Sequence, residues 1–222
     1  LNQEKRTYHS VLFKEEGAPE SAPLFPGESH ERKFEQAGSF PPVYRSNVVA
    51  GERSGTLPDV LAREGVHPET PHLPYTPGWD LVGTVDQLGE GVTGFELRQT
   101  VAAMPIHGGY AQYVCVPHGQ LVPVPDGLDA AEAVALVLNY ITAYQMLHRS
   151  AKVKPGQRVL FHGASGGVGT ALLQLGRLAG LEMYGTCSSR GASAVSDLSG
   201  VPIDYRQLDF VKEIHRLTGE GV

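Results

Sequence analysis

Cysteine is scarce in this sequence: Cys115 and Cys187 are the only two among 222 residues. Small secreted domains depend on several closely spaced cysteines that form a disulfide framework, and two distant ones cannot provide it. Such low cysteine use is typical of a reducing compartment. We therefore expect a cytoplasmic protein without a disulfide framework.

Long apolar runs and basic clusters are also missing. Stretches such as residues 133–138 are far shorter than the roughly 20 residues that span a bilayer, and no basic-then-apolar leader opens the chain. The net charge is −6 with a pI near 5.8, and lysine and arginine are scattered rather than gathered into the basic face that phosphates require. We expect no membrane span, no export signal and no nucleic-acid partner.

The first half of the chain contains an irregular segment and then a β-rich one. Residues 1–55 are rich in Glu, Ser, Pro, Gly and Arg without a persistent apolar period, which predicts irregular or loosely attached structure. Residues 56–127 contain short apolar segments separated by glycine and proline. We interpret these segments as strands at 79–88, 100–104, 109–116 and 120–124. Several short strands at this spacing predict a small barrel-like β-domain.

Residues 128–222 change to alternating helices and strands. Asp129 is placed to cap a helix whose apolar residues recur at helical spacing as far as Leu147. The expected strands cover 158–161, 182–187 and 201–205, and a helix capped by Asp209 follows. This order predicts the first half of a doubly wound dinucleotide-binding (Rossmann) domain. Because the chain ends at Val222, where a fourth strand should begin, we expect this domain to be truncated.

The most informative segment is a glycine-rich turn between the first of these strands and the next helix. The expected phosphate-binding residues are Ser165, Gly166, Gly167, Val168 and Gly169. Glycine permits a tight turn and close approach of a pyrophosphate and of the helix to the strand, and the helix N-terminus offers free N–H groups. The turn therefore predicts a bound dinucleotide. The alternative is a turn that packs the helix on the sheet without a ligand.

The residues after the second of these strands predict which dinucleotide is bound. Sites that prefer NAD place Asp or Glu there to hold the ribose hydroxyls, whereas this chain has Ser188, Ser189 and Arg190. Hydroxyls and a guanidinium suit a 2′-phosphate, which a carboxylate would repel. The sequence therefore favours NADPH, with an ordinary solvated arginine as the alternative for Arg190.

Five motifs follow one another along the chain: PGWDLVG at 77–83, GEGV at 89–92, GYAQY at 109–113, TAY at 142–144 and GASGGVG at 163–169. Over residues 56–222 this series resembles the zeta-crystallin-like quinone oxidoreductases of the medium-chain dehydrogenase/reductase family. The resemblance implies a GroES-like β-barrel domain at 56–127 and a Rossmann domain at 128–222, with NADPH between them. It also implies that Thr142 lies near the nicotinamide and Tyr205 against the adenosine end; core packing is the alternative for each.

The sequence also departs from this family. Zinc-dependent relatives have Gly-His-Glu where this chain has Gly78, Trp79 and Asp80, and they use clustered cysteine ligands that two distant cysteines cannot supply. We therefore expect no metal site. Quinone reductases often have Asn near the position of Thr56 and Tyr at the position of His67. The segment 1–55 scarcely matches the family.

The resemblance implies an enzyme that transfers hydride from NADPH to a quinone or an α,β-unsaturated carbonyl. His67 is a candidate proton donor because histidine titrates near neutrality, and Thr142 would orient nicotinamide or substrate. Two alternatives stay open: an enoyl reductase module of a polyketide synthase, and a non-catalytic NADPH-binding protein. The expected partners are a small-molecule electrophile and, for the full-length protein, a second copy of the chain in a homodimer.

Overall fold

The computed structural model describes residues 10–14, 57–68, 70–72, 74–111 and 113–222. The described residues form two compact units, divided between residues 137 and 138. Each unit has its own buried apolar cluster, and each is described separately below.

Unit 1 is built on an antiparallel five-stranded sheet with the strand order β4-β1-β2-β3-β5. Its strands are β1 (Ser10–Lys14), β2 (Leu81–Leu88), β3 (Thr100–Ala103), β4 (Cys115–Pro117) and β5 (Leu121–Pro123). Leu81, Val82, Val85 and Val101 are fully buried in its core, and Ala133 and Val134 at the start of helix α4 (Ala130–Tyr144) pack on the same cluster. The expected β-domain is confirmed.

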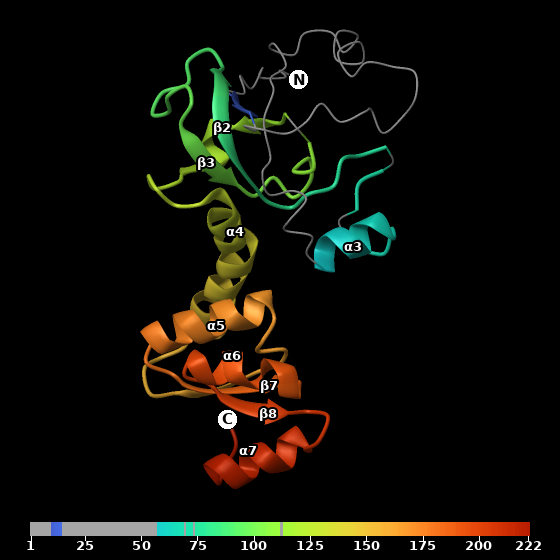
Figure 1. Cartoon of the computed structure of the whole chain (residues 1–222), viewed down its shortest axis with the longest axis vertical. Coiled ribbons are helices and arrows are strands. Elements are labelled where there is room, and N and C mark those ends of the chain that lie inside the picture. The colour runs from blue at the N-terminus through green and yellow to red at the C-terminus, as the bar shows by residue number, and fades with distance from the viewer. Residues whose placement is uncertain (1–9, 15–56, 69, 73, 112) are drawn as a thin grey trace, which may run out of the picture. The chain divides into compact units, whose positions relative to one another are not determined.

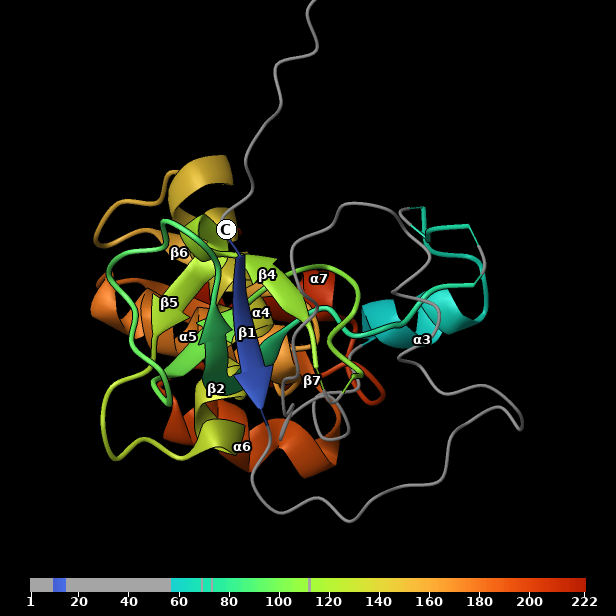
Figure 2. The same ribbon diagram turned by 90° about the horizontal axis from the view of Figure 1, so that it is seen from above.

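Two expectations for unit 1 need correction. Within the segment expected to be irregular, Ser10–Lys14 form β1, which pairs with both β2 and β4, as Figure 2 shows. The rest of residues 1–55, and Thr56, lie outside the described residues. The strand expected at 109–116 is also wrong over most of its length, because β4 begins only at Cys115.

Residues 108–110 are not in a strand because they pack backbone to backbone on the 76–78 segment. The N–H groups of Gly108, Gly109 and Tyr110 donate to the carbonyls of Thr76, Gly78 and Pro77 at 2.7, 3.1 and 2.8 Å. A Cβ on Gly78, whose φ is +106°, would stand 2.5 Å from the nitrogen of Tyr110. Glycine is needed at this point because any side chain would push the two segments apart.

Unit 2 contains a parallel sheet in the order β6-β7-β8, formed by β6 (Arg158–Phe161), β7 (Glu182–Cys187) and β8 (Val201–Asp204). Helices α5 (Gly167–Leu178) and α6 (Ala192–Asp197) cover one face, and α7 (Phe210–Thr218) covers the other (Figure 1). Met183 and Cys187 on β7 join the cluster beneath α5 and α6, whereas Tyr184 joins the cluster beneath α7. This alternation follows from the two-residue period of a strand.

The expected helix boundaries in unit 2 are confirmed. Gly180, with φ +68°, ends α5, and the N–H of Leu181 donates to the carbonyl of Gly176 at 3.0 Å, the bond of a Schellman motif. The carboxylate of Asp209 accepts the N–H groups of Val211 and Lys212 at the start of α7.

Helix α4 is capped as predicted, since Asp129 accepts the N–H groups of Ala131 and Glu132. After Tyr144 the helix continues into a π-helical turn, Gln145–Ser150. No helix in the described part of the chain is both long and apolar enough to cross a bilayer.

Candidate functional site

The glycine-rich turn leaves β6 and leads directly into α5. Gly163 adopts φ +67° with open space around it, and the N–H of Gly166 donates to its carbonyl at 2.9 Å. Gly166 is the exposed N-cap residue of α5, in an extended conformation without a side-chain cap. A Cβ on Gly169 would stand 2.6 Å from the Cα of Ala164. Gly169 therefore lets helix and strand approach, while Gly166 leaves the helix N-terminus open, as a pyrophosphate requires.

The neighbouring residues of the turn are placed as follows. Gly167 and Val168 are the first residues of α5; Gly167 is exposed and Val168 half-buried. The exposed side chain of Ser165 lies against Gly191, where a Cβ would stand 2.5 Å from the Cβ of Ser165. Gly191 was not among the expected site residues, and it matters because it lets the loops after β6 and β7 come together.

The three strands of the parallel sheet end at one edge, which gathers the predicted cofactor residues. Ser188, Ser189 and Arg190 directly follow β7, and Tyr205 follows β8. Arg190 is exposed, and half of Tyr205 is exposed (51%). The backbone N–H of Tyr205 donates to the carbonyl of Cys187 at 3.3 Å. The structure therefore brings the loop after β7 and the residue after β8 together.

A carboxylate that sequence reasoning missed lies at this same edge. Asp204, the last residue of β8, pairs with Cys187 and accepts a hydrogen bond from the Ser189 hydroxyl at 2.5 Å. That hydroxyl, followed by the backbone N–H of Arg206, lowers the pKa of the Asp204 carboxyl from its usual value. Burial raises the pKa of the Cys187 thiol, and the charge of Asp204 adds to the effect.

Helix α4 reaches the glycine-rich turn through Asn139, a second residue that the sequence analysis missed. A Cβ on Gly167 would stand 3.0 Å from both the Oδ1 and the Nδ2 atoms of Asn139. Thr142 lies three residues further along the same helix and is half-buried. Residues three apart share a helix face, so Thr142 lies on the same side of α4 as Asn139, which contacts the turn.

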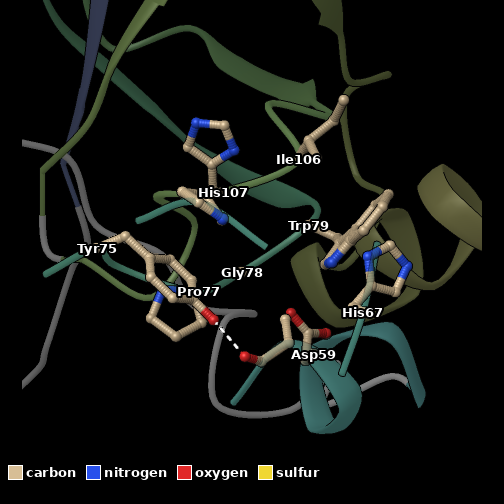
Figure 3. Close-up of a pocket in the computed structure, with 10 residues that line it drawn as sticks. Asp59, His67, Tyr75, Pro77, Gly78, Trp79, Ile106 and His107 are labelled. Atoms are coloured by element: carbon tan, nitrogen blue, oxygen red, sulfur yellow. Dashed lines mark hydrogen bonds between the residues drawn. The ribbon is translucent and has the colours of Figure 1, made fainter. Parts of the chain in front are cut away.

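Unit 1 contains a separate pocket that includes His67, the expected proton donor. Figure 3 shows the rings of His67 and Trp79 on one side, Tyr75 and Pro77 on the other, and Asp59 from α3 (Leu57–Arg63) between them. His67 packs edge-on against Trp79 with ring centroids 5.0 Å apart and an interplanar angle of 74°. The pocket thus combines aromatic walls with titratable groups.

The backbone around this pocket is held in uncommon conformations. Gly65, with φ +72°, ends α3 and directs the chain to His67. Ile106 adopts φ +74°, which is rare for a β-branched residue, and its N–H donates to the carbonyl of Trp79 at 3.1 Å. The Tyr75 hydroxyl donates to the carbonyl of Ala62 at 2.7 Å, marked in Figure 3. Glycine adopts such a conformation without strain, whereas Ile106 is strained, and strained residues concentrate at functional sites.

Two carboxylates in this part of unit 1 are buried: Asp59, which lines the pocket, and Asp80, which directly follows Trp79. Asp59 and Asp80 are each only 2% exposed, and both act on Tyr110. Burial raises the pKa of the Tyr110 phenol, and the charge of Asp59 and a hydrogen bond to it raise that pKa further. The phenol therefore stays neutral and ties the 105–110 loop to α3.

Metal-binding side chains do not gather in the described ranges: no group of three or more His, Cys, Asp or Glu residues there is arranged to hold an ion. Cys115 is exposed on β4 of unit 1, and Cys187 is buried in unit 2.

The fold and the geometry of the turn define a class of protein: a GroES-like β-domain followed by a partial Rossmann-like α/β sheet. Residues 54–126 match the family model of the alcohol dehydrogenase GroES-like domain. The human synaptic vesicle membrane protein VAT-1 homolog is 38% identical over 167 residues, which are 74% of this chain and 42% of that protein. Human quinone oxidoreductase is 35% identical over 165 residues, which are 73% of this chain and 50% of the relative.

Solved structures agree with these matches. The CurK enoyl reductase crystal structure superposes with a TM-score of 0.69 at 32% identity, over 74% of this chain and 52% of that one. The chain is therefore similar to the quinone oxidoreductases and their relatives in the medium-chain dehydrogenase/reductase family, as the motifs predicted. It spans about half the length of these relatives.

Proposed function

We propose that this protein is an NADPH-dependent oxidoreductase that reduces a quinone or an α,β-unsaturated carbonyl compound. The observation that carries the proposal is the turn at the end of β6, where Gly166 leaves the N-terminus of α5 uncovered beside the loop that follows β7. A side chain at that point would occupy the space that a pyrophosphate needs. The kinship with human quinone oxidoreductase supports the same chemistry.

The residues of unit 2 fit the cofactor in distinct roles. The N–H groups at the start of α5, from Gly167 to Gly169, would bind the pyrophosphate. Arg190 would bind the 2′-phosphate and Tyr205 would lie against the adenosine, with Ser165, Ser188 and Ser189 beside them. Thr142 would orient the nicotinamide. When bound, NADPH supplies a hydride, and the protein supplies orientation and an environment that excludes water.

A hydride added to a quinone or an enone leaves a negative charge on oxygen that must take up a proton. We assign this proton to the His67 imidazole, because His67 lines a pocket with Trp79 and the buried carboxylate of Asp59. The imidazole can then recover its proton from water.

Zinc has no part in this proposal, and one zinc per chain in an elemental analysis would contradict it.

An enoyl reductase acting on a thioester is the second candidate, and the similarity to the CurK enoyl reductase favours it. Both candidates use the same turn and differ in the electrophile. The third candidate is a protein that binds NADPH but does not oxidise it.

A cytoplasmic location and a homodimer of the full-length protein are further parts of the proposal.

The test combines binding with turnover. NADPH is titrated calorimetrically, and its oxidation is followed at 340 nm with a quinone, an enone and an enoyl thioester. Turnover of the quinone or the enone supports the proposal, turnover of the thioester alone supports the enoyl reductase, and binding without any turnover supports the third candidate. Absence of NADPH binding would overturn all three.

A further inference from the structure

The loop after β7 and the end of β8 share one contact with a charged group, the hydrogen bond between Ser189 and Asp204. Ser189 was expected to donate its hydroxyl hydrogen to a 2′-phosphate. In the structure that hydrogen is directed at the Oδ2 atom of Asp204, 2.5 Å away. A serine hydroxyl has a single proton to donate. While this bond is made, Ser189 therefore has only lone pairs to present to a phosphate, which itself accepts hydrogen bonds.

Two arginines, Arg190 and Arg206, are close in sequence to the two residues of this contact. Arg190 follows Ser189 directly, and Arg206 donates its backbone N–H to Asp204 Oδ1 at 2.9 Å. The guanidinium of Arg206 lies over the ring of Tyr205, with its Cζ atom 5.9 Å from the centroid. None of the ion pairs among the described residues joins Asp204 to either arginine. Neutral donors therefore hold the carboxylate in place, and the charge of Arg206 lowers its pKa further without forming an ion pair with it.

We propose that Asp204 is a specificity-determining residue that weakens the preference of this site for NADPH over NADH. This inference rests on the proposed function, since it requires an adenosine ribose at the ends of β7 and β8. A carboxylate there repels a 2′-phosphate and accepts a hydrogen bond from a 2′-hydroxyl. Sites that prefer NAD place this carboxylate at the end of the second strand, whereas here it reaches the same region from the third strand.

The experiment replaces the carboxylate with its neutral isostere, Asp204→Asn, and measures dissociation constants by calorimetry. The probes are NADPH and NADH, together with adenosine 2′,5′-bisphosphate and 5′-AMP, which contact only the adenosine side. The ratio of the NADH constant to the NADPH constant should rise about tenfold, because one repulsive charge close to the phosphate is removed. The ratio for the two adenosine nucleotides should move in the same direction.

Two further variants make the result specific. Asp204→Ser also removes the charge while keeping a hydrogen-bonding group, and it should shift the ratio in the same direction. Asp197→Asn removes one negative charge at the exposed end of α6, before β8 begins, and should leave the ratio within about twofold of the parent.

The outcomes separate this inference from the proposed function. A parent protein that binds none of the four probes overturns the proposed function, and the inference with it. If the parent binds, but both Asp204 variants shift the ratio no more than Asp197→Asn does, Asp204 does not read the 2′ position and only the inference is overturned. Circular dichroism spectra matching the parent exclude misfolding as the cause of a lost signal.

Discussion

The carboxamide of Asn139 lies directly against the backbone of Gly167, so that a Cβ on Gly167 would stand 3.0 Å from both of its polar atoms. Asn139 belongs to α4, and Gly167 is the first residue of α5. The glycine-rich turn is thus bounded on one side by a side chain from a helix that precedes it in the chain. This contact gives the turn a neighbour whose position can be changed by mutation.

The first prediction concerns this contact. Gly167→Ala should push the Asn139 carboxamide by a few tenths of an ångström and weaken NADPH binding. The double variant Gly167→Ala with Asn139→Ala should recover part of the loss, since the crowded group is gone. Calorimetric titration of the parent, both single variants and the double variant should give a coupling of about 1 kcal/mol. Losses that simply add would show that the two positions are independent.

The second prediction compares two glycines of the turn. Gly169→Ala should lower the free energy of unfolding by about 3 kcal/mol or more, because its Cβ would stand 2.6 Å from the Cα of buried Ala164. Gly163→Ala meets open space and carries only the cost of a left-handed backbone, about 1–2 kcal/mol. Urea unfolding of both variants measures the difference, and equal losses would contradict this account.

The third prediction isolates the phosphate contact. Gly166→Asp should fold, because position 166 is exposed and its Cβ would meet only the Gly163 carbonyl at 3.3 Å. Its carboxylate would stand beside the expected pyrophosphate, so NADPH affinity should fall at least about tenfold through repulsion. Gly166→Ala is the matched control for the added side chain. A folded Gly166→Asp protein that keeps its NADPH affinity would mean that the turn is only structural.

The fourth prediction concerns Arg190. Arg190→Ala should weaken NADPH more than NADH, by about 1.5–3 kcal/mol for a charge-assisted phosphate contact. The control is Arg177→Ala, which removes an exposed arginine from the last turn of α5. Titration of both variants with both dinucleotides measures the effect. Equal weakening of NADPH and NADH by Arg190→Ala would assign the phosphate contact to another residue.

The fifth prediction follows from the raised pKa of Tyr110. The folded protein keeps this phenol neutral at a pH where the unfolded chain, with an ordinary tyrosine pKa of about 10, begins to ionise. Its contribution to stability is therefore present below about pH 10 and is lost as the pH rises toward the folded pKa.

Tyr110→Phe should lower stability at pH 8 by about 1 kcal/mol, through loss of the hydrogen bond to Asp59. It should also show a smaller further decline between pH 8 and pH 11 than the parent. Urea unfolding at both pH values measures this, with Tyr205→Phe, an exposed tyrosine, as control. Parallel declines in the parent and Tyr110→Phe would remove Tyr110 as the source.

The local amino-acid sequence pattern was sufficient to locate the glycine-rich turn and the ends of the strands. A buried strand, spaced glycines and an amphipathic helix predicted the 163–169 turn, because each of these features depends on residues close together in the chain. Parallel strands joined by helices must end at one edge, so the placement of Ser188 and Tyr205 at the same edge of the sheet as the turn also followed from the order of elements. The same reasoning failed at 109–116, where packing on the 76–78 segment replaced the expected strand.

Tertiary structure alone decided which side chains became partners at these places. The Ser189 hydroxyl could have faced a phosphate, yet it bonds Asp204, fifteen residues further along. The side chain of Asn139 contacts Gly167 at the start of another helix. Asp59, on helix α3, contacts Tyr110, which is about fifty residues further along the chain. Local sequence determines backbone conformation, because steric and hydrogen-bonding preferences act over a few residues. Pairing of polar groups across the fold depends instead on the packing of whole elements, which brings those groups within hydrogen-bond reach.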